Sequence, residues 1–498
     1  TDGGAFSSTS GFYYNPLSWV YYTSTGKKRN GSAAGSDYGS NTTSTTGDVL
    51  GFAIDLDAGT ISVYKNGMDL GVMYDNLPSD TDFTPLWMAS KQATNNTVVA
   101  NFGQHPFKYS PPEGHGPVVA HPPETILARP DQFVGVTTYT GNGSTNRPMK
   151  IGFQPDLVSL KSRESDFNYF WCDSVRGHQK LLKSNTTGSE TTSTTGITAF
   201  NSDGFTLGNG SQTNLNNDDM VAWCWKAGGN KNTFNVDDVG YASAAAAGLD
   251  GGSLNPTAAS VGTKQGFAII KADPDQSAET IAHGLGRKPA FIVSKPLDSA
   301  ILDWNVYHQS ISGNLSTSTS NFIRFTTAAS QSSSNYWGSA GDMNTTTFAV
   351  AAGNNANNQD NPIYYVWADV PGLQKFGSYL SIGGNDANFV YLGFRPAILW
   401  IKSAIHSADT TSWCVFTDEI YDNPYQKPLY VNKAIREGYR GNASNEGTFD
   451  VDLVSNGFKL LTNVGEVNEG SSGTDRYIYC AWAKQPAFGL YGSQSNAR

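Results

Sequence analysis

Short apolar alternations separated by turn residues recur along the whole chain. In GDVLGFAIDLDAGTISVYKNGMDLG (residues 47–71), apolar and polar side chains alternate on both sides of the turn residues Asp57–Gly59. Alternation with a period of two is typical of β-strands with one buried face. Asn66 and Gly67, which tolerate positive φ angles, predict a type I′ hairpin after the second strand. The stretch therefore predicts an antiparallel β-meander.

A second pattern repeats three times downstream. It opens on GFQPDLVSLK, GRKPAFIVSK and GFRPAILWIK, in which a lysine follows a proline by six residues. A tryptophan, a phenylalanine and a closing aromatic segment (MVAWCW, IYYVW or YIYCAW) then come in the same order each time. The spacing varies only where Ser, Thr, Asn and Gly accumulate, as loops vary around a fixed framework. The repeat positions are Pro155, Lys161, Trp171, Phe205 and Trp225; Pro289, Lys295, Trp304, Phe348 and Trp367; and Pro396, Lys402, Trp413, Phe458 and Trp482.

Each repeat is interpreted as a small β-module. The proline is expected to open a strand at the edge of a sheet, where its missing N–H costs least. Aromatic side chains at alternate positions are expected to fill the interior between two sheets. A ligand site lined by Trp171 and its counterparts is the alternative, but their strand-like surroundings favour core packing. The predicted fold class is all-β, with tandem antiparallel β-sandwiches.

Composition divides the chain along the same lines. Prolines and glycines around residues 111–130 are typical of an extended linker, and the short Ala run before Gly248 is too brief for a helix. The second and third repeats follow with almost no gap, so we expect them to share an interface. The predicted division is an N-terminal sandwich at 1–112, a linker at 113–132, module 1 at 133–228, an extended connector or small hairpin at 229–265, module 2 at 266–372 and module 3 with a C-terminal tail at 376–498.

Charge and cysteine usage exclude several classes of protein. The net charge is −10 over 498 residues, and no run of Lys and Arg offers a nucleic-acid groove. No stretch approaches the roughly 20 apolar residues of a membrane span, so we expect no membrane insertion. The four cysteines form no CxxC pair and lie in aromatic segments, which favours buried thiols over zinc ligands. So few cysteines suit synthesis in a cytoplasm.

Residues that could suggest catalysis have simpler interpretations. Asp55 and Asp57 could form the carboxylate pair of a glycosidase, but their place beside a turn favours a turn role. The HGLG segment at His283–Gly286 could be an oxyanion turn, but it occupies a turn position of the repeat. HExxH and GxSxG motifs are absent. We therefore expect no enzyme activity, no catalytic residue and no cofactor. The clusters VDDVG and DNPYQK are predicted to be turns, and a calcium ion held by separated loops stays open.

Residues Gly47–Gly71, with NFGQHPF at Asn101–Phe107, resemble the C-terminal half of a SPRY domain. The motif DLDAGTISVYKNG followed by a late NFG strand carries the resemblance. It implies a concanavalin-like antiparallel β-sandwich that recognises partners through its loops and performs no catalysis. The segment before Gly47 is short for such a domain, so the first strands are expected upstream of Thr1.

The remainder resembles a repeated domain of unknown function found beside SPRY domains in structural proteins of marine tailed bacteriophages. GFQPDLVSLKSR, SDGFTLG, VAWCWKAGG, PTAASVGTKQGFAIIK, VPGLQKFGSY and LGFRPAILWIK carry this resemblance, among other segments. It implies a virion component on the particle surface, a tail or capsid fibre or similar appendage, synthesised in the bacterial host cytoplasm. It implies no catalytic or binding residue.

The resulting hypothesis is a non-enzymatic virion structural protein that contacts a host-surface glycan or protein through Ser/Thr/Asn/Gly-rich loops. Tyr336 and Trp337 in SSNYWGSAG are candidates for exposed rings that stack on sugars. The alternatives are a glycan-depolymerising tailspike and a capsid decoration or assembly protein without a ligand. The expected partners are other virion proteins and further copies of the chain. Because tandem sandwiches would bury little between distant domains, a homo-oligomer is expected, with a trimer favoured although no heptad seam is present.

Overall fold

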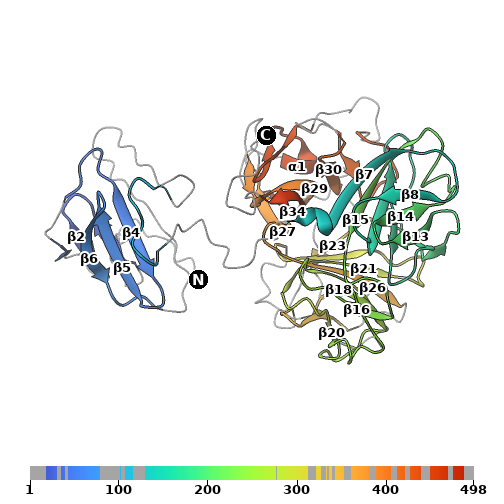
Figure 1. Ribbon diagram of the computed structural model, residues 1–498, viewed down its shortest axis with the longest axis horizontal. Coiled ribbons are helices and arrows are strands. Elements are labelled where there is room, and N and C mark those ends of the chain that lie inside the picture. Colours follow the sequence, from blue (N-terminus) through green and yellow to red (C-terminus); the bar gives the residue numbers. More distant parts are fainter. Residues whose placement is uncertain are drawn as a thin grey trace. The chain divides into compact units, whose positions relative to one another are not determined.

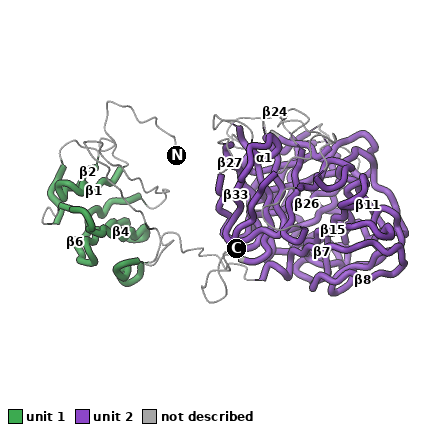
Figure 2. The backbone as a smooth tube through the Cα atoms, turned by 90° about the horizontal axis from the view of Figure 1, so that it is seen from above, with its two compact units in different colours: residues 1–124 green, residues 125–498 purple. Residues whose placement is uncertain are grey.

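The regular secondary structure of the computed structural model is almost entirely β-strand, and the chain divides into two compact units, Thr1–Glu124 and Thr125–Arg498 (Figure 2). Within the described residues, helical structure is limited to the 3₁₀ turn η2 (Pro130–Gln132) and the single turn α1 (Gly465–Asn468). Neither has the length or apolar run that a membrane span requires. The predicted all-β class with antiparallel sandwiches is confirmed. The structure describes residues 18–30, 35–39, 43–78, 101, 107–115, 129–275, 277–311, 321–326, 332–333, 336–338, 343–352, 361–381, 388–404, 412–420, 427–438, 449–468 and 475–486.

The first unit contains the predicted β-meander. Asn66 and Gly67 have φ angles of 50° and 83°, which confirms the type I′ hairpin. The Asn66 side chain accepts a hydrogen bond from the Val49 amide at 2.9 Å, so the hairpin is tied to the start of the first strand. The strands of the meander are β4 (Leu50–Asp55), β5 (Thr60–Lys65) and β6 (Met68–Tyr74), and a second sheet contains β1 (Val20–Tyr22), β2 (Lys27–Arg29) and β3 (Ser36–Asp37).

The second unit contains three modules, which Figure 1 shows in teal, in green to yellow and in orange to red. Module 1 contains β7 (Val134–Thr140), β8 (Arg147–Lys150), β9 (Leu157–Ser162), β10 (Phe170–Asp173), β11 (Lys180–Lys183), β12 (Thr191–Thr192), β13 (Ile197–Asn201), β14 (Gly204–Leu207) and β15 (Asp219–Trp225). Module 2 contains β16 (Phe234–Val236), β17 (Val239–Tyr241), β18 (Ala258–Gly262), β19 (Phe267–Lys271), β20 (Glu279–Ala282), β21 (Pro289–Pro296), β22 (Asn305–His308), β23 (Asn321–Arg324), β24 (Ser332–Ser333), β25 (Thr347–Val350) and β26 (Pro362–Ala368). Module 3 contains β27 (Gln374–Leu380), β28 (Phe389–Tyr391), β29 (Phe394–Ser403), β30 (Cys414–Thr417), β31 (Leu429–Tyr430), β32 (Val451–Val454), β33 (Gly457–Leu460) and β34 (Arg476–Pro486).

Each module pairs a large inner sheet with a small outer sheet. The inner sheets share one five-strand order: β7-β15-β9-β10-β11, β19-β26-β21-β22-β23 and β27-β34-β29-β30-β31. The outer sheets are β8-β14-β13, β20-β25 and β28-β33-β32. Residues 229–265, predicted to be a connector or small hairpin, contain the hairpin β16–β17 together with β18, and these strands extend inner sheet 2. Asp237 and Asp238 form its turn, with φ angles of 48° and 66°, as predicted for VDDVG.

The closing aromatic strand of each repeat is buried on both faces. In β15, Met220, Ala222 and Cys224 pack against outer sheet 1, while Val221, Trp223 and Trp225 face the other modules. The strands β26 and β34 divide their side chains in the same way. Double-sided burial explains why these segments are continuously apolar rather than alternating.

The repeat tryptophans therefore do not fill the interior between the two sheets of a module, as the sequence interpretation held. They form one core shared by all three modules. The phenylalanines Phe205, Phe348 and Phe458 do lie between the sheets of their own modules. Each inner sheet has a second apolar face, and among the described residues the other two modules cover that face.

At the centre of the shared core, three equivalent tryptophans form a triangle. The ring centroids of Trp225, Trp367 and Trp482 lie 5.4 to 6.2 Å apart, and each pair meets edge to face. Edge-to-face packing places the electropositive ring edge on the electron-rich face of its neighbour. The expectation that the modules bury little between one another is wrong, because inner sheets far apart in sequence close around this triangle.

The repeat prolines do not lie on edge strands. The strands β9, β21 and β29 each lie between two neighbours in their inner sheets. Pro155 precedes its strand, and the ladder shifts register beside both Pro289 and Pro396. A β-bulge leaves one residue unpaired, so it accommodates a residue that has no N–H to donate.

Candidate functional site: the polar pocket of module 1

All three repeat lysines are buried, and two of them, Lys161 and Lys295, hold loops in place. Lys161 Nζ donates to the carbonyl oxygens of Phe167 at 2.7 Å and Ser165 at 3.4 Å, in the loop that follows β9. Lys295 Nζ donates to Leu302 in the equivalent loop at 2.8 Å and reaches Thr187 of module 1 at 2.9 Å. Burial lowers the pKa of Lys161 to about 8 and that of Lys402 to about 7. The Lys161 and Lys295 contacts give these lysines a structural role.

A second set of equivalent positions joins each module to the next. Asp173, His308 and Thr417 stand opposite corresponding residues of β9, β21 and β29. Asp173 accepts a hydrogen bond from Tyr365 of module 2 at 2.7 Å. His308 Nε2 donates to the Tyr479 carbonyl of module 3 at 3.0 Å, and Thr417 Oγ1 accepts from Trp223 Nε1 of module 1 at 2.8 Å. These polar groups are therefore used for docking the modules.

The strongest of these links contains a buried ion pair. Arg176 Nε lies 2.5 Å from Asp173 Oδ2, and Arg176 also contacts Glu190 at 3.2 Å and the Tyr365 hydroxyl at 3.3 Å. Both Arg176 and Asp173 side chains are almost fully inaccessible. A buried charge pair persists only when its remaining polar atoms are satisfied, as they are here.

The buried histidines His283 and His308 and the four cysteines lie in environments that do not activate them for catalysis. Burial lowers the pKa of both His283 and His308 to about 4, and both ring nitrogens of each histidine hydrogen-bond backbone atoms. All four cysteines are buried and form no disulfide, as predicted, and burial raises the pKa of the Cys172 and Cys224 thiols. A thiol becomes a nucleophile when its pKa is lowered, so these environments oppose reactivity.

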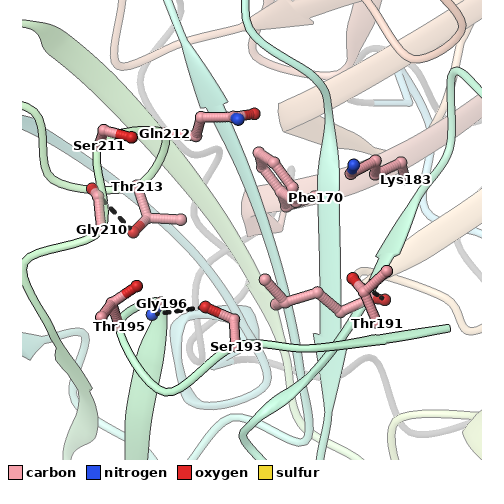
Figure 3. Close-up of a pocket in the computed structure, with 11 residues that line it drawn as sticks. Phe170, Lys183, Thr191, Ser193, Thr195, Gly196, Gly210, Ser211, Gln212 and Thr213 are labelled. Atoms are coloured by element: carbon pink, nitrogen blue, oxygen red, sulfur yellow. Dashed lines mark hydrogen bonds between the residues drawn. The ribbon is translucent and has the colours of Figure 1, made fainter.

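An open pocket of about 200 Å³ lies in module 1 (Figure 3). One wall consists of Phe170 and Lys183, which pair across β10 and β11, and of Thr191 in β12. The opposite wall is formed by the loops at 193–196 and 210–213, as Figure 3 shows. A hydrogen bond from Gly210 N to Thr195 O at 2.7 Å joins the two loops, and one from Gly196 N to Ser193 Oγ at 3.1 Å closes the first of them.

The chemistry of this pocket suits binding. Its lining residues are Phe170, Leu181, Lys183, Thr191, Ser193, Thr195, Gly196, Gly210, Ser211, Gln212 and Thr213. Hydroxyl, amide and ammonium groups can hydrogen-bond a polar ligand. The lining includes no carboxylate, imidazole or thiol, the groups that general acid–base and nucleophilic catalysis use most. Sequence reasoning missed this pocket because its Ser, Thr and Gly residues come from separate loops and form no motif.

The candidates Tyr336 and Trp337 are not exposed. Their exposed fractions are 3% and 1%, and both belong to the core of module 2. Tyr336 stacks on Phe322 with ring centroids 5.0 Å apart, and Trp337 meets Tyr307 edge to face at 6.2 Å. The expectation that these rings face solvent is wrong, because strands distant in sequence cover them.

Carboxylates singled out in the first unit also have structural roles. Asp55 Oδ1 accepts a hydrogen bond from the Ala58 amide at 2.9 Å and so caps the turn after β4. Asp57 is exposed within that turn. Among the described residues, no group of three His, Cys, Asp or Glu side chains is placed to hold a metal ion.

The fold and the pocket define a modular β-sandwich protein with a polar pocket in module 1. Residues 129–486, more than half of the chain, match the domain of unknown function DUF7483, and residues 6–105 match the SPRY domain. The chain therefore belongs to the DUF7483 family and carries a SPRY domain at its N-terminal end. One family domain covers all three modules, in agreement with their shared core.

Characterised relatives resemble only a small part of the chain. The Ran-binding proteins 9/10 homolog of Drosophila melanogaster is 30% identical over 171 residues, which is 30% of this chain and 17% of that protein. Ran-binding protein 9 of Danio rerio and of Homo sapiens are each 37% identical over 92 residues, 18% of this chain and 14% and 12% of those proteins. The chain thus spans less than a fifth of the length of these relatives. No solved structure matches the chain.

Proposed function

We propose that this chain is a non-enzymatic structural protein of a bacteriophage virion, a tail or capsid appendage that contacts the host surface. The observation that carries the proposal is that cysteine, histidine and lysine side chains of the second unit make structural contacts. The buried cysteines, His283, His308, Lys161 and Lys295 contact backbone or core, and the pocket offers hydrogen-bonding groups without an acid–base pair. A rigid scaffold with polar loops suits adhesion.

The phage origin rests on the resemblance of the repeat segments to domains that accompany SPRY domains in marine phage structural proteins. Placement on the particle surface and synthesis in the bacterial cytoplasm belong to the same proposal. Other virion proteins are the proposed partners, together with a host-surface glycan or protein. A homotrimer stays a prediction, but the reason given for it no longer holds, because the three modules already cover one another.

Labelling of intact particles tests the proposal. An antibody raised against residues 129–486 is applied to purified virions of the phage that encodes the chain, and the label is located by electron microscopy. Label on tail or capsid surface is expected, and its position separates the two locations. Label confined to unassembled protein contradicts the proposal.

A second assay separates adhesion from depolymerisation. The purified chain is incubated with host surface polysaccharide, and both retention and new reducing ends are measured. Retention without cleavage is expected. New reducing ends that accumulate with time would establish the tailspike alternative. Antibody label on the virions combined with no retention of the chain on the polysaccharide would favour a decoration or assembly protein.

A further inference from the structure

Outer sheet 3 presents two aromatic rings to solvent. Phe389 and Tyr391 in β28 are 50% and 47% exposed, whereas Val390 between them packs against the core of module 3. Residues two apart in a strand share one face, with their side chains about 7 Å apart. Figure 2 shows the neighbouring strand β33 at the outer boundary of the second unit.

The other two modules show that the framework does not require these rings. Each outer sheet places a buried phenylalanine opposite the middle residue of its first strand, and that middle residue is Met149, Ile281 or Val390. The two residues that flank it are Pro148 and Lys150 in module 1, Thr280 and Ala282 in module 2, and Phe389 and Tyr391 in module 3. An exposed aromatic pair thus occurs in one module of three at a position where the fold accepts small or polar residues.

Charged side chains surround the rings. Register places Lys459 directly opposite Phe389, and Asp452 opposite Lys459 on the next strand. Lys375 Nζ lies 5.7 Å from the centroid of the Tyr391 ring and donates to the Tyr391 carbonyl at 3.2 Å. The result is an apolar platform with hydrogen-bonding groups at its rim.

The size and charge of this platform favour a sugar over a protein or a nucleic acid as its ligand. A stable protein interface needs about 800 Å² from each partner, far more than two half-exposed rings supply. The net charge of −10 disfavours a nucleic acid, although aromatic rings also stack on bases. A sugar ring matches an aromatic ring in area, presents an apolar C–H face for stacking and carries hydroxyls that suit Lys and Asp side chains.

We propose that outer sheet 3 is a glycan-binding surface on which Phe389 and Tyr391 stack against sugar rings of a surface polysaccharide. This inference rests on the proposed attachment function and gives it a ligand class and a location. Lys459 and Asp452 hydrogen-bond the sugar hydroxyls at the rim. One other role exists for Phe389, because its ring covers Gly457, where an added Cβ would lie 3.2 Å from Phe389 Cε2.

Binding of the intact chain to a printed array of bacterial surface glycans tests the proposal, followed by native electrophoresis in gels that contain the retained polysaccharide. The double variant Phe389→Ala/Tyr391→Ala is expected to bind about tenfold more weakly or worse, the loss typical when anchoring rings are truncated. Tyr391→Phe keeps the ring and should keep most of the binding. Ile301→Ala removes an apolar side chain that is 83% exposed elsewhere and should change nothing.

Three outcomes would overturn the inference. In the first, the wild-type chain binds no glycan on the array. In the second, the double variant binds as tightly as wild type and melts at the same temperature. In the third, it binds equally but melts at a lower temperature, which assigns Phe389 to covering Gly457. Because particle labelling is independent of the array, a labelled virion combined with any of these outcomes leaves the virion function standing and removes only the glycan surface.

Discussion

His283 and His308 are uncharged in the folded chain, because burial lowers the pKa of each to about 4. An exposed histidine in the unfolded chain has a pKa near 6.5, so the unfolded state binds more protons between pH 6.5 and pH 4. The free energy of unfolding should therefore fall as the pH drops through this window, by at most about 3 kcal/mol for each histidine. Asp156 has the opposite effect on the free energy of unfolding. Burial raises the pKa of this carboxyl to about 6, so the folded state takes up its proton at a higher pH than the unfolded state does.

Urea unfolding followed by tryptophan fluorescence at pH 7 and pH 4.5 measures this effect. The variant His308→Gln cannot take up a proton and should show a weaker dependence on pH than wild type. His115→Gln in the first unit is the matched control and should keep the wild-type dependence. An unchanged slope in His308→Gln would show that His308 does not contribute to acid sensitivity.

The Thr417 hydroxyl is the hydrogen-bond acceptor that the structure gives the buried Trp223 indole. Thr417→Val keeps the shape of the side chain but leaves this N–H unsatisfied, so the free energy of unfolding should fall by about 1–3 kcal/mol. Thr417→Ser restores the hydroxyl and should recover most of that loss. Chemical denaturation of the three proteins measures the difference, and equal losses in both variants would mean that packing rather than the hydrogen bond matters.

At the level of elements, the hairpin between β5 and β6 depends on its glycine. Gly67 has a φ of 83°, and a Cβ there would lie 2.7 Å from Tyr109 Cδ1. Gly71 has a φ of 89° with nothing near its missing Cβ. Gly67→Ala should therefore destabilise the first unit by about 1 kcal/mol or more, and by more than Gly71→Ala, which carries the backbone strain alone.

Differential scanning calorimetry of the intact chain measures this comparison through the transition of the first unit. The transition of the second unit serves as an internal reference and should not move. If Gly71→Ala lowers the first transition as much as Gly67→Ala, the contact with Tyr109 contributes nothing.

The strands and turns could be predicted from the sequence better than the segments that pack against them. The recurring Pro, Lys, Trp and Phe positions predicted three related modules, and Asn66-Gly67 predicted its own turn, because both signals are local. The segment MVAWCW indicated burial on both faces but could not reveal what covers the second face, since Trp225 meets Trp367 and Trp482 from other modules. Tyr336 was misjudged for the same reason: its Ser- and Asn-rich neighbours indicate a loop, and its cover comes from Phe322.

For the whole molecule, the shared core predicts that residues 125–498 unfold as one cooperative body. Trp400 contacts Trp171 and Trp225 of module 1, Phe291 and Phe325 of module 2 and Trp482 of its own module, with ring centroids 5.1 to 6.2 Å away, and so joins all three modules. Trp400→Ala should lower the free energy of unfolding by about 3–5 kcal/mol. The second unit should still melt in one transition, as measured by calorimetry, and separate melting of module 3 would contradict a common core.

The same core predicts that a module cannot stand alone. Residues 133–228 expressed by themselves would expose Trp171, Trp223 and Trp225, which are fully buried in the intact chain. A patch of this kind promotes aggregation, so the fragment should be insoluble or bind a hydrophobic dye, whereas residues 125–498 should not. A soluble fragment with a sharp melting transition would show that the inner-sheet faces do not need their partners.

The triangle of tryptophans is nearly symmetric, but a neighbouring position is occupied by a different residue in each repeat. Trp400 lies four residues after its repeat proline, where the other repeats place Ser159 and Val293. The large Trp400 side chain thus fills space that the smaller Ser159 and Val293 leave. Close packing of the shared core therefore depends on the summed volume of these three side chains. The three repeats therefore cannot replace one another. A protein with three copies of the first repeat would have three serines at this position and a cavity in the shared core. A protein with three copies of the third repeat would have three tryptophans there, and their side chains would clash.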